Sequence, residues 1–185
     1  RQNHGVHRQT VEAILKQAGL VANRLEELGE VELLTILLNQ DIVAHPDQFD
    51  DAMVKDTVET IAQMAPIQRK NGPDGCNRYV ISHAEDIYAV LYVFSLLRWC
   101  GWGQGDVPVD IIPLFESMEG MQNAGAIMQA LFEIPPYRTH VAQRRNRQTI
   151  MLGFSDGTKD GGFLQANWSI YTTKESLSAV RDDHA

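Results

Sequence analysis

Three short apolar segments, each followed by a helix-like pattern, limit this chain to a small set of folds. The segments are residues 79–82 (YVIS), 109–115 (VDIIPLF) and 149–154 (TIMLGF). Strands that alternate with helices pair in parallel, because each helix returns the chain to the starting edge of the sheet. We therefore predict an α/β fold, with part of a TIM (β/α) barrel of parallel strands and additional helices as the favoured architecture. A doubly wound sheet is the second candidate, although no Gly-x-Gly-x-x-Gly motif supports it.

The first 75 residues carry no strand pattern and are expected to form a mostly helical connection. Apolar spacing predicts helices from Thr10, over residues 31–38, and over residues 51–64, the last ending before Pro66. Residues 76–185 hold the three strand–helix units. In the first of these, Ser82 and Glu85 have the spacing of a capping box. Between the second and third units, residues 138–147 are rich in arginine and are expected to form a solvated surface loop, with a rim that attracts anions as the second interpretation.

Composition excludes several classes of function. The formal net charge of −8 argues against binding to nucleic acid or to an anionic membrane. No apolar run is long enough to span a bilayer. The two cysteines, Cys76 and Cys100, lack metal-ligand spacing, which is typical of a reducing, cytoplasmic setting.

Two carboxylates follow predicted strands at the positions where active sites form in parallel sheets. Glu116 comes directly after the second segment, and Asp156 lies in the polar stretch that begins at Ser155 after the third. Because parallel strands end at one edge, we expect both side chains to lie at that edge, where a hard cation such as Mg²⁺ or Mn²⁺ would relieve their repulsion. Lys159 follows within reach of an anionic substrate. The alternative, which the residues alone leave open, is that Glu116 and Asp160 cap helices and Lys159 pairs with Asp160 on the surface.

Four segments, in the same order, resemble the phosphoenolpyruvate carboxylase family. Residues 154–162 (FSDGTKDGG) resemble its aromatic-Ser-Asp-Ser-Gly/Ala-Lys-Asp-Ala-Gly signature, and residues 113–119 (PLFESME) resemble its Pro-Leu-Phe-Glu-Thr segment. Residues 79–82 are similar to its Tyr-Val-Ile-Ser strand, and Arg1-Gln2 with His7 to its Arg-Gln strand end. The resemblance extends over nearly all of this chain, which would be a central fragment of a full-length family member.

The resemblance implies a fold, a reaction and a set of residue roles. The family folds as a TIM barrel with extra helices, works as a homotetramer, and adds bicarbonate to phosphoenolpyruvate to give oxaloacetate and phosphate. Carried over by position, Glu116 and Asp156 would bind Mg²⁺ or Mn²⁺, Arg1 would contact the substrate phosphate, and Lys159 would assist at the bicarbonate side. The family's catalytic His motif and its Gly-rich Arg loop do not occur in this sequence, so we expect the chain alone to be inactive.

Two other functions remain open. One is another Mg²⁺-dependent barrel lyase that acts on a pyruvate enolate. Activity of the parent protein that does not depend on bicarbonate would favour this alternative. The other is a non-catalytic binding or scaffold module that keeps the carboxylates as helix caps. Failure to bind Mn²⁺ would favour the second.

Overall fold

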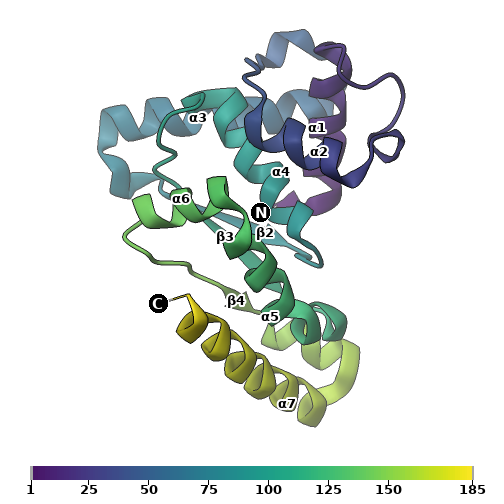
Figure 1. The fold of residues 1–185 in the computed structure, drawn as a ribbon, viewed down its shortest axis with the longest axis vertical. Coiled ribbons are helices and arrows are strands. Elements are labelled where there is room, and N and C mark those ends of the chain that lie inside the picture. Colours follow the sequence, from purple (N-terminus) through teal and green to yellow (C-terminus); the bar gives the residue numbers. More distant parts are fainter. Residues whose placement is uncertain (1, 185) are drawn as a thin grey trace. The chain divides into compact units, whose positions relative to one another are not determined.

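The structure is a computed structural model that describes residues 2–184 and consists of helices and short strands (Figure 1). The helices are α1 (His4–Gln17), α2 (Glu30–Asn39), α3 (Ala52–Asn71), α4 (Ile87–Leu97), α5 (Met118–Glu133), α6 (Pro135–Gln143) and α7 (Phe154–Asp183). The strands are β1 (Gln2–Asn3), β2 (Arg78–Ser82), β3 (Asp110–Phe115) and β4 (Met151–Leu152). Shorter helical turns are η1 (Leu25–Glu27), η2 (Pro46–Gln48), η3 (Pro73–Gly75) and the π-helical η4 (Arg98–Trp102). The mixed content of helices and parallel strands confirms the predicted α/β class.

The chain divides into two compact units, which are described separately. The site unit contains Tyr79–Val90 and the chain from Asp110 onward, and the helical unit contains Gln2–Arg78 and Leu91–Val109. Within residues 2–184, no helix is both long enough and apolar enough to cross a membrane. The division at residue 75 expected from the sequence stays a prediction.

The sheet of the site unit places β3 between β2 and β4. β3 and β4 run parallel, with Leu114 opposite Met151 and Phe115 opposite Leu152. β3 is buried from Ile111 to Phe115, as a central strand covered on both faces should be. β4 contains only two residues, so it is shorter than the predicted strand over residues 149–154. The carboxyl ends of β3 and β4 therefore lie at the same edge of the sheet.

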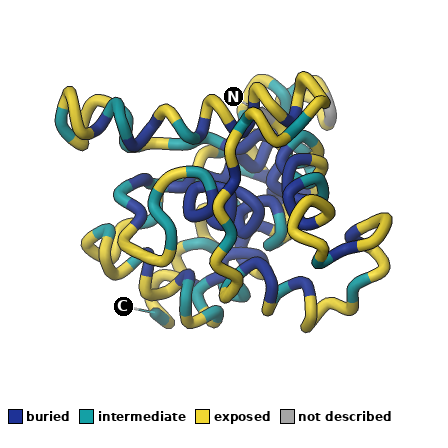
Figure 2. Tube along the Cα trace, turned by 90° about the horizontal axis from the view of Figure 1, so that it is seen from above, coloured by how far each residue is buried: buried dark blue, intermediate teal, exposed yellow. Residues whose placement is uncertain are grey.

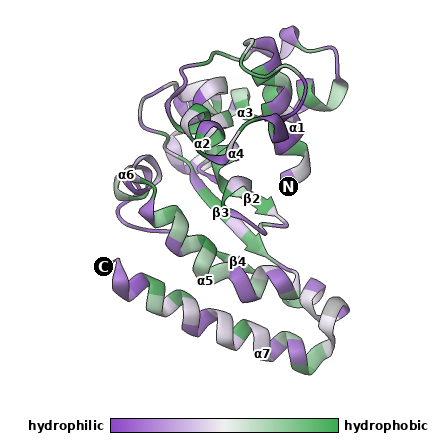
Figure 3. Cartoon of the chain, turned by 45° about the vertical axis from the view of Figure 1, so that its right-hand side comes forward, coloured by the Kyte–Doolittle hydropathy of each residue, from purple (hydrophilic) through white to green (hydrophobic). Residues whose placement is uncertain are grey.

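Helices α5 and α7 pack side by side along their lengths (Figures 1 and 3). A Cβ atom added at Gly125 of α5 would overlap the Ser176 Oγ atom of α7 and lie 3.2 Å from the Ser176 Cβ atom, so the helices approach closely. The Thr173 hydroxyl donates to the Met121 carbonyl across the same interface, at 2.9 Å. At Gly162, where φ is 79°, α7 changes direction. The polar stretch before it, which follows the third apolar segment, is already helical from Phe154.

The core of the helical unit lies between α1 and α3, whose buried residues are drawn dark blue in Figure 2. These residues are Val11, Ile14, Leu15, Val54, Val58 and Ile61. α1 begins at His4 rather than at Thr10, because the Asn3 side chain accepts the Val6 N–H at 3.1 Å and caps the helix. α3 continues past Pro66 to Asn71, so the predicted end was wrong. Buried residues beyond the proline, such as Gln68, hold this last part of the helix in place.

The predicted capping box formed by Ser82 and Glu85 is also wrong. The helix after β2 is not capped by Ser82, because α4 begins at Ile87 and the Asp86 carboxylate accepts the Ala89 N–H at 2.9 Å. Asp86 thus provides the side-chain acceptor that a helix start requires.

The arginine-rich segment also differs from its prediction, because its first part forms helix α6. Pro135 stands at the first helical position, where proline favours a helix rather than ending one. The fully buried Tyr137 anchors α6, and its hydroxyl lies 2.8 Å from the Gln148 Oε1 atom. The Arg144 side chain donates to Asp110 at 2.7 Å, so this arginine is paired rather than displayed on a loop.

Candidate functional site

The candidate site lies at the carboxyl edge of the sheet in the site unit. Glu116 follows β3 directly, and Gly153 follows β4 and leads into α7. The Gly153 N–H donates to the Phe115 carbonyl at 2.8 Å, which extends the β3–β4 pairing to the point where the chain turns into α7. This pairing brings the backbone before Asp156 against the backbone that carries Glu116.

Gly153 permits an approach that no other residue type would allow. A Cβ atom at this position would lie 2.5 Å from the Glu116 Cβ atom and 3.0 Å from its Cα atom. Both distances are shorter than normal carbon–carbon contacts of about 3.5–4.0 Å. The sequence prediction missed this role, although a glycine inside an apolar strand segment is a signal of close backbone approach.

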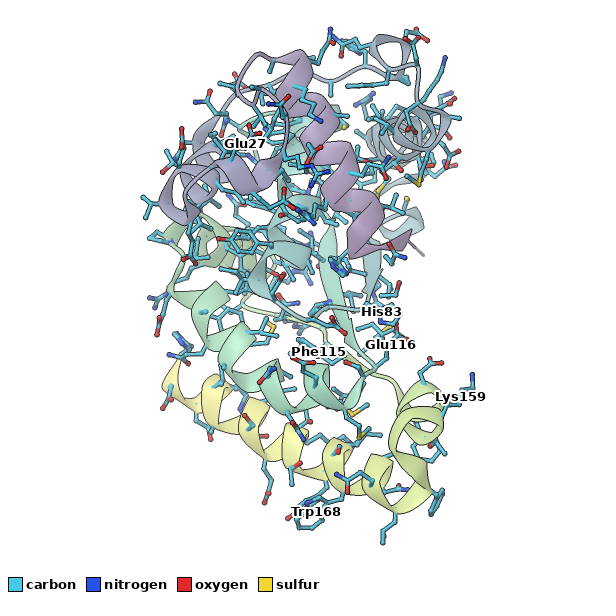
Figure 4. All side chains as sticks on the ribbon, turned by 90° about the vertical axis from the view of Figure 1, so that its right-hand side faces the viewer. Glu27, His83, Phe115, Glu116, Lys159 and Trp168 are labelled. Carbon is cyan, nitrogen blue, oxygen red and sulfur yellow. The ribbon has the colours of Figure 1, made fainter. Side chains whose placement is uncertain are left out.

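Glu116 is held by the turn that follows β2. Its side chain is 2 % exposed, and its Oε1 atom accepts the backbone N–H of His83 at 3.1 Å. The Nε2 atom of the His83 imidazole lies 3.7 Å from the same oxygen, and Figure 4 shows the two side chains next to each other. The sequence prediction also missed His83, because its segment was interpreted as a capping box.

Glu116 does not cap the helix that follows it. Ser117 does so, with its Oγ atom accepting the Gly120 N–H at 2.9 Å. The same hydroxyl lies 3.2 Å from the Glu85 carboxylate, so Glu85 bonds to Ser117 instead of completing a capping box. The alternative in which Glu116 serves as a helix cap is therefore wrong.

Asp156 lies in the first turn of α7, where the positive end of the helix dipole favours a carboxylate. Its side chain is 48 % exposed, and the Lys159 Nζ atom lies 3.5 Å from its Oδ1 atom. The Lys159 side chain is 78 % exposed and extends outward from α7 (Figure 4). The side chain of Asp160 and the whole of Arg1 lie outside what the structure describes.

Two glycines in the polar stretch let the first turns of α7 pack on α5. A Cβ atom at Gly157 would lie 3.1 Å from the Met121 Cε atom, and one at Gly161 would lie 2.9 Å from the Met118 Sδ atom. The Met118 and Met121 side chains therefore lie under the segment that carries Asp156. This packing fixes the position of Asp156 independently of its own polar contacts.

The donor set at this edge suits a hard cation. Carboxylate oxygens are the ligands that Mg²⁺ and Mn²⁺ prefer, and a few protein ligands leave room for water and substrate. The buried Glu116 side chain is already oriented by a backbone hydrogen bond, as a preformed ligand would be. Among residues 2–184, no three His, Cys, Asp or Glu side chains are grouped closely enough to form a metal site by themselves.

Comparisons with known proteins agree along the whole chain. The family model of phosphoenolpyruvate carboxylase matches residues 1–185. The phosphoenolpyruvate carboxylase of Mycobacterium leprae (strain TN) is 36 % identical over 189 residues, which cover 97 % of this chain and 20 % of the relative. That of Nitrosomonas europaea is 33 % identical and covers 100 % of this chain and 21 % of the relative. This chain therefore spans about a fifth of the length of these relatives.

Proposed function

Because the chain belongs to the phosphoenolpyruvate carboxylase family, we propose that it carries part of the active site of a lyase that carboxylates phosphoenolpyruvate. The reaction joins phosphoenolpyruvate and bicarbonate and yields oxaloacetate and phosphate. The observation that carries the proposal is the placement of Glu116 at the end of β3, against the Gly153 turn that leads to Asp156. The whole-chain family match supports it, because the signature residues 154–162 lie within the matched region.

Glu116 and Asp156 would hold one Mg²⁺ or Mn²⁺ ion in this enzyme. The bound cation would stabilise an oxygen of the substrate that becomes negative during the reaction. Glu116 would contribute a fixed oxygen ligand, because burial and the His83 N–H restrict its side chain. Lys159 would use its exposed ammonium group to attract bicarbonate or phosphate, exchanging its contact with Asp156 for one with the substrate. Arg1 would bind the substrate phosphate, as the family resemblance implies.

We also propose that the site unit forms part of a TIM barrel. β2, β3 and β4 follow one another across the sheet, and each leads into a helix, as successive barrel units do. The homotetramer and the cytoplasmic location implied by the family are part of the same proposal. The cysteines Cys76 and Cys100 support that location, because both are free thiols.

Mn²⁺ binding to the purified chain tests the metal site. We expect titration followed by electron paramagnetic resonance to reveal one bound ion, with affinity reduced at least about tenfold by Glu116→Gln and by Asp156→Asn. Glu119→Gln is the matched control, because Glu119 is an exposed residue in the first turn of α5. If wild-type chain binds no Mn²⁺, or if the control weakens binding as much as the site variants do, the proposal fails and the scaffold alternative is favoured.

A further inference from the structure

Large apolar side chains cover the side of α7 that is turned away from α5, which we call the outer face of α7. It consists of Phe163, Leu164, Trp168 and Tyr171, which are between 54 % and 82 % exposed. The rings of Trp168 and Tyr171 stack with their centroids 5.7 Å apart, and Figure 4 shows Trp168 projecting away from the helix. The opposite side of α7 is buried against α5, with Thr173 bonded to the Met121 carbonyl. The outer face is therefore an ordered apolar surface.

The outer face also lies in a stretch without charge. Residues 161–173 contain no Asp, Glu, Lys or Arg, although charged residues make up 22 % of the chain and its formal net charge is −8. Depletion of charge and enrichment in Trp, Tyr and Phe are the features that distinguish the centre of a protein interface from other surface. A second molecule with the same net negative charge can approach this stretch without bringing like charges together.

The exposed area of the outer face is sufficient for a small dimer. Large apolar side chains have about 150–250 Å² of surface each, so four of them at these exposures offer about 500 Å². Two copies that cover each other there would bury about 1,000 Å², which is the lower limit for a specific interface. An apolar patch of about 300–600 Å² is also the size that often marks an interaction site on a monomer.

We propose that the outer face of α7 is an interface at which two copies of this chain pair, with their α7 helices antiparallel about a twofold axis near Trp168. Leu164 precedes Trp168 by four residues and Tyr171 follows it by three, so all three lie on one side of the helix. An axis at Trp168 places Leu164 of each copy opposite Tyr171 of the other. The face is thus complementary to itself, as a closed twofold interface requires.

A membrane fits the same face less well than a second copy does. A helix that lies on a membrane surface combines an apolar face with a polar face rich in Lys and Arg. The side of α7 opposite the outer face is packed on α5, and a net charge of −8 disfavours an anionic bilayer. The inference concerns a surface formed by α7 alone and does not depend on the proposed metal site.

Sedimentation equilibrium of the purified chain tests the interface. We expect monomers at low concentration and dimers as the concentration rises toward about 100 µM, because interfaces at the lower size limit give weak complexes. Leu164→Glu should raise the dissociation constant at least about tenfold, because it places a charge in the apolar contact. Val31→Glu is the matched control, because Val31 is 79 % exposed, belongs to the helical unit and receives the same charge. The control should change the dissociation constant less than about twofold.

Mixing two variants tests the antiparallel arrangement. Tyr171→Lys alone should weaken dimers as Leu164→Glu does, whereas an equimolar mixture of the two should form dimers more tightly than either variant alone, because opposite charges then face each other. Circular dichroism establishes that each variant is folded.

Four results would overturn the inference. They are a wild-type chain that stays monomeric, larger assemblies in place of dimers, equal effects of Leu164→Glu and Val31→Glu, and a mixture that associates no better than its components. A monomeric chain that binds neutral lipid vesicles through Trp168 would assign the face to a membrane instead. Mn²⁺ binding decides the proposed function separately, since the outer face contains no ligand of the metal site.

Discussion

Gly153→Ala should disrupt both the fold and the metal site, although it adds only one methyl group. The added Cβ atom would lie 2.5 Å from the Glu116 Cβ atom and 3.0 Å from the Glu116 Cα atom. Neither neighbour is the mobile end of a side chain, so rotation cannot relieve the overlap. Because normal carbon–carbon contact begins at about 3.5 Å, the backbone near Gly153 has to move by about 1 Å away from β3.

The cost of that movement can be worked from the contacts at this position. Gly153 is half-buried, and inserting a methyl group where the neighbouring atoms cannot rotate away typically costs about 1–3 kcal/mol. The displacement also weakens the bond from the Gly153 N–H to the Phe115 carbonyl, now 2.8 Å long, which contributes about 0.5–1.5 kcal/mol. We therefore expect the free energy of unfolding to fall by about 2–4 kcal/mol. Asp156 would move relative to Glu116, and Mn²⁺ affinity should fall at least about tenfold.

Urea denaturation and Mn²⁺ titration measure these two effects. Gly29→Ala is the matched control, because a Cβ atom at Gly29 meets no other atom within 4 Å and the φ angle there is −66°. The control should change the free energy of unfolding by less than about 0.5 kcal/mol. If Gly153→Ala behaves like the control in both measurements, the close approach of β4 to Glu116 does not position the site, and the reasoning is wrong.

Three other substitutions or conditions have defined outcomes. Leu91→Ala should lower the free energy of unfolding by about 2–5 kcal/mol in a denaturant titration, because Leu91 is fully buried, and a change below about 1 kcal/mol would contradict this. Burial, reinforced by the Arg144 cation, lowers the pKa of His140 to about 4, so its stabilising effect should be present above pH 6.5 and lost as the pH falls toward 4. Denaturation of His140→Gln across that range should reveal a shallower loss of stability than wild type. Trp168→Ala should cost less than about 1 kcal/mol, because the Trp168 residue is 60 % exposed and loses mainly its stacking on Tyr171.

The elements of the site unit that were predicted well have unambiguous patterns. Residues 109–115 form a short segment that is apolar except for Asp110, and they correspond closely to strand β3 (Asp110–Phe115), which is buried from Ile111 onward. The helix-like pattern that follows this segment corresponds to α5 (Met118–Glu133), which is capped by Ser117. In both segments, the residues that favour a strand or a helix locally are also the residues that become buried. The sequence alone is therefore sufficient to identify the strand and the helix.

The predictions that failed depended on residues whose role is decided by distant contacts. Pro66 was expected to end a helix, but α3 tolerates it because the helix beyond is anchored by Gln68, whose side-chain amide donates to the Pro108 carbonyl at 3.0 Å. Glu85 has capping-box spacing from Ser82, yet its carboxylate is bonded to Ser117 of another segment. Sequence spacing records only local alternatives, so it cannot reveal which partner a polar side chain takes in the folded chain.

The positions of Glu116 and Asp156 after two strands could be predicted from the sequence, whereas the contacts that hold these residues could not. Their role as metal ligands stays a prediction. Glu116 and Asp156 could be located because each follows a strand pattern, whereas the separation of their carboxylates stays a prediction. The roles of Gly153 and His83 depend on contacts between segments that are far apart in the sequence, such as the bond from His83 to Glu116. A glycine and a turn histidine have many local uses, so neither residue type indicates by itself which carboxylate it contacts.

The buried face of helix α7 could not be predicted from the sequence either, because most of its large apolar side chains lie on the exposed side. Leu164, Trp168 and Tyr171 have the spacing of an apolar stripe, but they are 82 %, 60 % and 54 % exposed. Purple and green bands accordingly alternate along the helix in Figure 3. Apart from Val180, the buried positions are small or polar, with Ala166 and Thr173 among them. A close approach to α5 requires small side chains, and the Thr173 hydroxyl satisfies its own hydrogen bond within that interface. The close approach to α5 therefore explains why most buried positions of α7 are small or polar while its largest apolar side chains are exposed.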